Sequence, residues 1–240
     1  ATQELDGALL DAASRASLVD IQRALDRGAN INEARDKNSH TPLHLVALRG
    51  HRECLRLLLD QSASVDASDA DGCTPLHLAA CVGHQHCISL LLERGADINA
   101  EDSILRRTAL LLAAFNDQHQ CIAILLDRHA DINAQDSSGS TALHLASFHG
   151  NFRCIEYLLD RHADINAQDT TGSTPLHVAS YNGHHQCIEP LLKGSADINA
   201  RDKGGATPLH DATSTGTLEC IQVLLESGAD PSIIDVRVPT

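Results

Sequence analysis

The sequence predicts an all-α solenoid of stacked helix–turn–helix pairs, and three observations lead to this prediction. A Thr-x-Leu motif begins every 33 or 34 residues from Thr41 to Thr207. Only two Tyr and three Phe occur among 240 residues, with no Trp or Met, whereas a conventional globular core of this size uses aromatic volume. The hydrophobic fraction is nevertheless 42%, which is too high for a disordered chain. Thin repeated layers of small aliphatic residues account for all three observations.

The repeats divide the whole chain. We expect one array, residues 1–240, in which a degenerate copy around Ala8 precedes six regular copies. The expected boundaries are 1–35 for an N-terminal capping repeat, then 36–68, 69–101, 102–135, 136–168, 169–201 and 202–234, with 235–240 as the start of a further repeat. Because the last residues, Asp235 to Thr240, resemble another repeat and the chain begins with Ala1, we expect a piece of a longer protein.

The first helix of each repeat begins at the motif. Thr41 stands where an N-cap is needed, and Pro42 fits the first helical position, whose N–H would be unpaired anyway. His44 stands three residues after Thr41 and can take the role of Glu in a capping box. We expect this helix to end at Gly50.

The second helix follows at once. Cys54, Leu55, Leu58 and Leu59 have the spacing of a single apolar face. Glycine, or Ser or His in its place, is expected to close this helix in a left-handed conformation, at Gly28, Ser62, Gly95, His129, His162, Ser195 and Gly228. An Asp-x-x-Gly turn then leads to the next Thr. Two such short helices cannot bury their apolar faces alone, so the copies must stack.

Two repeats depart from the pattern. In the repeat of Thr108, Leu111 replaces the capping His, Asp117 replaces the Gly between the helices, and the preceding finger is one residue longer. In the sixth repeat, Pro190 lies inside the second helix, where it could cost about 3 kcal/mol unless the helix kinks. Pro190 is either a hinge or a tolerated irregularity.

Charge and cysteine content limit the partners and the compartment. The formal charge of −14 argues against nucleic acid or an anionic membrane as the main partner. No apolar run approaches the length of about 18 residues that a membrane span needs. Eight cysteines without a secretory signal indicate reduced thiols. We therefore expect an intracellular, cytoplasmic protein, with the nucleus left open.

Fifteen His and eight Cys could suggest a metal site, but their positions favour packing. Six cysteines occupy one position of the second helix, and equivalent helices in neighbouring repeats should lie about 8–10 Å apart. This spacing suits neither a disulfide nor a shared zinc. The local clusters at His84-Gln-His86-Cys87, His119-Gln-Cys121 and His184-His185-Gln-Cys187 remain as the alternative. With no phosphate loop or nucleophile elbow either, we expect no metal, no cofactor and no enzyme activity in this segment.

The pattern Asp-x-x-Gly-x-Thr-Pro-Leu-His-x-Ala, then Gly-His, Leu-Leu and Gly-Ala-Asp-Ile-Asn, resembles the ankyrin repeat family over roughly residues 5–234. The resemblance implies antiparallel helix pairs with a β-hairpin finger per repeat, stacked into a curved slab. It also implies binding of other proteins on a concave surface formed by the fingers and the first helices.

Departures at one position of the first helix suggest where a partner binds. Three of the five aromatic residues stand seven residues after the motif Thr in consecutive repeats, although Leu48 and Ser214 show that packing needs no ring there. An exposed apolar stripe of this kind is typical of a binding hot spot; the alternative is that each ring packs under a neighbouring finger. The expected partner-binding residues are Leu48, Cys81, Phe115, Phe148 and Tyr181, the following residues Arg49, Asn116, His149 and Asn182, and the finger residues Arg106 and Arg107.

We therefore expect a non-catalytic scaffold or adaptor module that binds another protein or a peptide segment as a monomer. The alternative is a targeting or autoinhibitory domain of a larger signalling enzyme, such as a nucleotide-exchange factor. The sequence itself does not choose the partner.

Overall fold

The computed structural model describes residues 2–234, and this part of the chain contains fourteen α-helices and no strand. Contacts divide the chain into two compact units, Ala1–Ala130 and Asp131–Thr240, each of which is described by itself. Unit 1 contains α1 (Thr2–Ser14), α2 (Leu18–Asp26), α3 (Pro42–Leu48), α4 (Arg52–Asp60), α5 (Pro75–Val82), α6 (Gln85–Glu93), α7 (Ala109–Phe115) and α8 (His119–Asp127). Unit 2 contains α9 (Ala142–His149), α10 (Phe152–Asp160), α11 (Pro175–Tyr181), α12 (His185–Lys193), α13 (Pro208–Thr215) and α14 (Leu218–Glu226).

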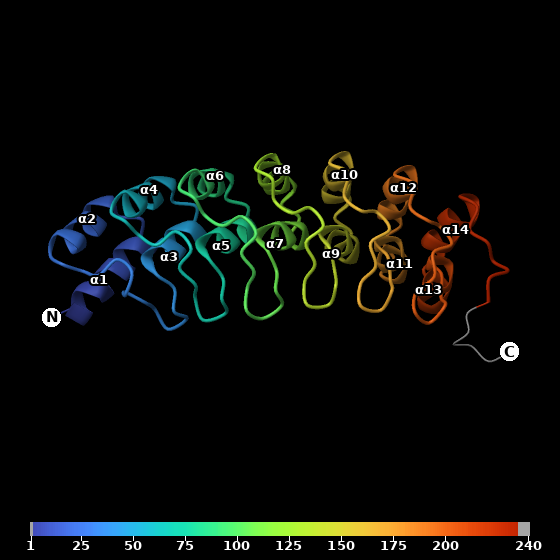
Figure 1. Cartoon of the computed structure of the whole chain (residues 1–240), viewed down its shortest axis with the longest axis horizontal. Coiled ribbons are helices and arrows are strands. Elements are labelled where there is room, and N and C mark those ends of the chain that lie inside the picture. The colour runs from blue at the N-terminus through green and yellow to red at the C-terminus, as the bar shows by residue number, and fades with distance from the viewer. Residues whose placement is uncertain (1, 235–240) are drawn as a thin grey trace. The chain divides into compact units, whose positions relative to one another are not determined.

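Each unit has two layers of helices and one row of loops. In unit 1 the first helices of the repeats pack in the order α1, α3, α5, α7, and the second helices in the order α2, α4, α6, α8. In unit 2 the corresponding rows are α9, α11, α13 and α10, α12, α14 (Figure 1). The finger loops extend from the first-helix row, on the side away from the second helices (Figure 1). We call the row of second helices the outer layer.

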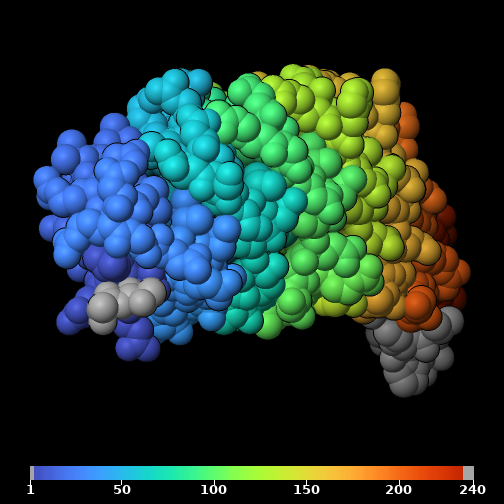
Figure 2. All heavy atoms as spheres, turned by 60° about the vertical axis from the view of Figure 1, so that its left-hand side comes forward, coloured from blue at the N-terminus to red at the C-terminus, as the bar shows by residue number. Residues whose placement is uncertain are grey.

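Small aliphatic side chains fill the space between the layers, as the composition predicts. Ala79, Ala80, Ala113 and Ala114 are fully buried, so neighbouring helices approach closely. The six cysteines of the second helices are buried as well: Cys54, Cys87, Cys121, Cys154, Cys187 and Cys220. Their expected packing role is therefore confirmed. Figure 2 shows the successive layers of unit 1 lying directly against one another on the visible face.

The local signals of the sequence have the expected conformations. Thr and His form a capping box at the start of α3, α5, α9, α11 and α13. Positive φ angles occur at Gly28, Gly95 and Gly228, and also at the residues that replace glycine, Ser62, His129, His162 and Ser195. Asp117, which replaces the glycine between helices, has a φ of 58°.

Two details differ from the expectation, and a third bears on the open alternatives for Pro190. Helix α1 begins at Thr2, well before Ala8, because the degenerate first copy has no Pro or Thr cap to start the helix later. The fingers of the described residues contain tight turns instead of regular strands, since only one or two backbone bonds close each loop. Helix α12 continues through Pro190, and the structure assigns it as one element.

No helix within residues 2–234 is both long and apolar enough to cross a membrane. The expected start of an eighth repeat, residues 235–240, lies outside the described residues.

Candidate protein-interaction surface

An Asp carboxylate shapes each finger. Oδ1 of Asp69 accepts hydrogen bonds from the backbone N–H groups of Asp71 and Cys73, both at 2.9 Å. The same pair of bonds is formed by Asp36, Asp136, Asp169 and Asp202 in their own loops. Such side-chain bonds replace the strand ladder that the loop lacks, so each finger is held in a defined shape.

Neighbouring fingers are also bonded to one another. The amide of Ala70 donates to the carbonyl of Asn38 at 3.1 Å, and Ser103 donates to Asp71 at 2.9 Å. Gly72 is required at this approach: its φ is +78°, and a Cβ atom there would lie 2.6 Å from the Ser103 amide nitrogen. In unit 2, Thr170 donates to Ser138 and Lys203 to Thr171. Within each unit the fingers therefore form a linked row.

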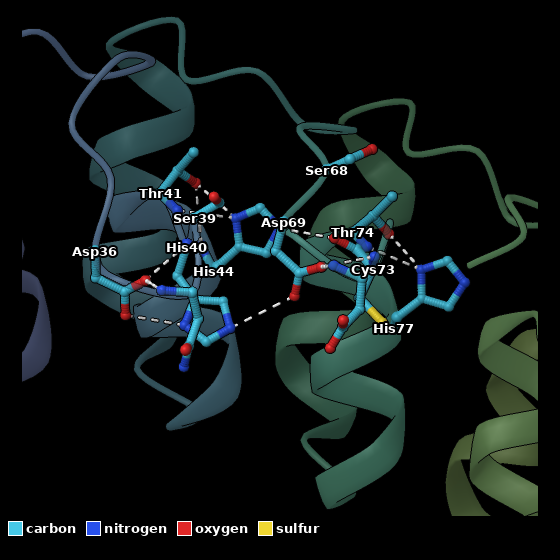
Figure 3. Close-up of polar contacts among 12 residues, drawn as sticks. Asp36, Ser39, His40, Thr41, His44, Ser68, Asp69, Cys73, Thr74 and His77 are labelled. Carbon is cyan, nitrogen blue, oxygen red and sulfur yellow. Dashed lines mark hydrogen bonds and ion pairs between the residues drawn. The ribbon is translucent and has the colours of Figure 1, made fainter. Parts of the chain in front are cut away.

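The capping histidines join one repeat to the next. In Figure 3, Nδ1 of His44 accepts from the Thr41 amide at 3.2 Å, and Nε2 faces the Cys73 carbonyl at 3.0 Å. These partners require the tautomer with the proton on Nε2. His77, His144 and His177 make the same pair of contacts. Burial lowers the pKa of His44 to about 4 and also lowers those of the other three, so the rings are neutral at pH 7.

His40 links the first two fingers through its imidazole ring. Its ring lies between two carboxylates, with Nδ1 3.0 Å from Asp36 Oδ2 and Nε2 3.5 Å from Asp69 Oδ2 (Figure 3). Burial alone would raise the pKa of Asp36, but hydrogen bonds from His40 and Asn38 outweigh it and lower the pKa. The sequence analysis missed this cluster, since His40 follows no repeat rule.

In unit 1, the expected stripe is only half-exposed. Leu48, Cys81 and Phe115 are each partly covered. The guanidinium of Arg107 lies 4.7 Å from the centre of the Phe115 ring, so the finger residue covers the ring as the packing alternative requires. Phe115 is therefore not the open aromatic anchor that the sequence suggested.

The other expected residues of the lengthened finger and of α7 also have partners within the chain. Arg106 donates two hydrogen bonds to the carboxylate of Glu101, at 2.8 and 3.1 Å. The Arg106–Arg107 pair is thus not an open cluster of positive charge. Asn116 donates to the carbonyl of Leu112 at 2.9 Å and contacts Cys81 Sγ at 3.4 Å.

In unit 2, the two aromatic residues of the expected stripe are exposed. Phe148 on α9 is 51% exposed and Tyr181 on α11 is 56% exposed, and these two helices pack side by side. His149 is exposed and contacts the Phe148 ring edge to face, with a centroid distance of 4.9 Å. Asn182 is half-buried and donates to the Val178 carbonyl at 2.8 Å. Two adjacent exposed rings with a polar border remain available here.

Some connecting residues could have been found from the repeat pattern alone. The Asn of the Ile-Asn motif accepts a hydrogen bond from the next repeat: Asn133 from the Asp164 amide and Asn166 from Asp197, both at 2.9 Å. His84 and His184 bond the carbonyls of Leu48 and Phe148. The recurrence of this Asn, at Asn99, Asn133, Asn166 and Asn199, was the available signal in the sequence.

The described residues contain no group of three or more His, Cys, Asp or Glu that could hold a metal ion. None of the eight cysteines, all of which lie among these residues, forms a disulfide. Burial raises the thiol pKa of Cys87 and Cys121 to about 11, which keeps these sulfurs protonated.

Arg49, the last of the expected partner-binding residues, is exposed at the end of α3.

Rigid helix pairs with linked fingers define a tandem-repeat protein of the protein-binding type. Comparison with family models identifies three stretches, residues 9–102, 99–169 and 162–235, as ankyrin repeats (3 copies). The chain belongs to the ankyrin repeat family, as its motifs suggested. Among solved structures, the human ASB11 ankyrin repeat domain is similar, with a TM-score of 0.83 and 27% identity over 93% of this chain and 99% of that one. No curated protein sequence matches significantly. Ankyrin repeats are a non-catalytic fold and generally act in protein–protein interaction.

Proposed function

We propose that this array is a scaffold or adaptor that holds a partner protein segment on its finger and first-helix face. The exposure of Phe148 and Tyr181 supports this proposal most directly, because both rings stand at the same position of adjacent helices. Packing does not require them, since Ser214 occupies the same position of α13. Aromatic side chains of this kind are the usual anchors of protein interfaces.

The same face would serve equally if the array were a targeting or autoinhibitory domain of a larger signalling enzyme. In both cases the partner contacts a row of fingers whose shape is set before binding by the Asp turns. Such preorganisation reduces the ordering cost of association. The proposed partner is a protein or peptide, with no nucleic acid or membrane involved, and the array acts as a monomer.

The experiment is an affinity capture of partners from a cell lysate by the full chain, with quantitative mass spectrometry. Phe148→Ala should deplete the specific partners, because loss of a central aromatic anchor weakens binding by about 2 kcal/mol or more. Tyr181→Ala should act in the same direction. The matched control is Arg52→Ala on α4, an exposed outer-layer residue in the other unit.

Thermal unfolding of each variant separates recognition from packing. We expect the melting temperature of Phe148→Ala to stay close to that of the unaltered chain, because half of the ring is exposed. The proposal fails if this variant loses many degrees of melting temperature while it captures the same partners as before.

A further inference from the structure

A large groove lies on the outer layer of unit 2, away from the fingers. It has a volume of about 1540 Å³ and is lined by α10, α12 and α14, which follow one another in the outer row (Figure 1). Phe152 and Tyr157 stand at its border with 38% and 39% of their surface exposed. A groove of this size exceeds the roughly 300–1,000 Å³ of a small-molecule pocket and fits a peptide segment.

Pro190 forms part of this groove because it is smaller than its equivalents. The corresponding residues of the other regular repeats are Leu57, Leu90, Ile124, Tyr157 and Val223. Proline has a smaller side chain than the leucines and the isoleucine that occupy this position in unit 1. It therefore fills less of the space between α10 and α14. It also has no N–H to donate to the carbonyl of Gln186, another residue that lines the groove.

Two of the three groove helices, α12 and α14, lack a cation that four of the repeats carry at the end of the second helix. At the residue that ends the second helix, four repeats have arginine: Arg27, Arg94, Arg128 and Arg161. In unit 1, Arg94 reaches back to Asp60 at 2.8 Å, and Arg128 to Glu93 at 3.7 Å. The groove has Gly194 and Ser227 at this position, and neither can offer a positive charge.

The groove carboxylates are consequently unneutralised. Glu156, Asp160 and Glu226 are exposed, and none of them forms an ion pair within residues 2–234. The one lysine of the groove, Lys193, is already held by Glu189 at 2.7 Å. A groove in which apolar residues such as Tyr157 and Val223 lie beside carboxylates is complementary to a segment that is apolar on one side and positively charged on the other.

We propose that the groove of α10, α12 and α14 is a second docking site, which binds a basic amphipathic helix of a partner protein. The apolar side of that helix would lie against Tyr157, Pro190 and Val223. Its Lys or Arg residues would take the place of the missing arginines beside Glu156, Asp160 and Glu226. This site is separate from the finger face and does not depend on the function proposed there.

The test measures fluorescence anisotropy of a labelled Leu/Lys amphipathic peptide with the full chain at about 0.15 M salt. A peptide of about 18 residues spans roughly 27 Å as a helix, enough to cross three helices spaced about 8–10 Å apart. We expect binding at least about tenfold tighter than that of the matched Leu/Glu peptide. The double variant Glu156→Lys, Glu226→Lys should weaken binding about tenfold or more.

Two controls locate the binding. Glu33→Lys, Glu53→Lys in unit 1 changes the net charge equally and should shift the affinity by no more than about twofold. Phe148→Ala, on the finger side, should leave it unchanged. Pro190→Leu should raise the melting temperature, by restoring a helix bond, yet weaken the peptide about fivefold or more by filling the groove. The proposal would be overturned if the unit 1 control lost as much peptide affinity as the Glu156→Lys, Glu226→Lys variant. It would also be overturned if Pro190→Leu bound the peptide with unaltered affinity.

Discussion

His44 shows how one side chain can serve two repeats. Its ring accepts the Thr41 amide within its own repeat and donates to the Cys73 carbonyl of the next. The cap was visible in the sequence as a Thr followed three residues later by His. The second bond was not, because it joins residues 29 positions apart whose proximity depends on the stacking. The ring is costly to protonate chiefly because burial removes the water that would stabilise its charged form.

The array should therefore lose stability in mild acid. The pKa of His44 is lowered from 6.5 to about 4, so the unfolded chain takes up the proton first. The stabilisation is complete above pH 6.5 and is lost as the pH falls toward 4. His44 alone contributes about 3 kcal/mol to this loss. Urea unfolding at a series of pH values gives the unfolding free energy as a function of pH. This free energy should fall less steeply with decreasing pH in His44→Gln than in the original chain. It should fall as steeply as in the original chain in His86→Gln, an exposed control. An equal pH dependence of the unfolding free energy in His44→Gln and in the original chain would contradict this account.

Cysteine reactivity should separate the buried row from the two outlying thiols. Cys73 and Cys81 are half-buried, whereas the six cysteines of the second helices are buried. Burial and the neighbouring Asp69 raise the pKa of Cys73 to about 12, while burial alone raises that of Cys81. Cys81 should therefore react first with iodoacetamide, ahead of Cys73 and of the buried six. A time course by peptide mass spectrometry measures the order; a rate for Cys87 or Cys154 as high as that of Cys81 would contradict the burial.

At the scale of the element, α12 combines an irregular sequence with a regular shape. The helix stays continuous at Pro190 because Cys187, Ile188 and Leu191 are buried against the first-helix row. Their packing holds the backbone on both sides of the proline. The sequence showed the missing hydrogen bond and left the alternatives of hinge and tolerated irregularity. The continuous helix favours tolerance, with the loss confined to one turn.

Hydrogen exchange should detect this weak turn. We expect lower amide protection in residues 184–193 than in residues 151–160, because Pro190 has no N–H to form the helix bond to Gln186. Helix α10 is a matched reference, since it has the same length and occupies the same place in the preceding repeat. Uniform protection across the two helices would show that α12 loses nothing at the proline.

At the scale of the whole molecule, unit 1 contains four helix pairs and unit 2 contains three. Each repeat is stabilised by its neighbours, so stability grows with the number of stacked copies. Both units reach the minimum of about three copies that repeat arrays need. The −14 charge of the full chain adds repulsion at low salt without altering the fold.

Separate chains of residues 1–130 and 131–240 should therefore each fold. Circular dichroism should give a helical spectrum and a cooperative melt for both, with the higher melting temperature for residues 1–130, which hold one more helix pair. A fragment that melts without a cooperative transition would show that its repeats depend on the rest of the chain.

The sequence by itself determined the repeat length, the two helices of each repeat, their caps and the burial of the cysteine row. These follow from local rules that act within one turn of helix or within one loop, so the six regular repeats, spaced 33 or 34 residues apart, each display them. The tertiary structure decided which side chains of the surface remain open. Phe115 and Phe148 occupy the same position of their repeats, yet only Phe115 is covered by a neighbouring arginine. The outer groove likewise appears only when Pro190 in α12, Gly194 at its end and Ser227 at the end of α14 are brought together beside α10. Exposure depends on what residues distant in the sequence bring to the same place, and no local pattern encodes that.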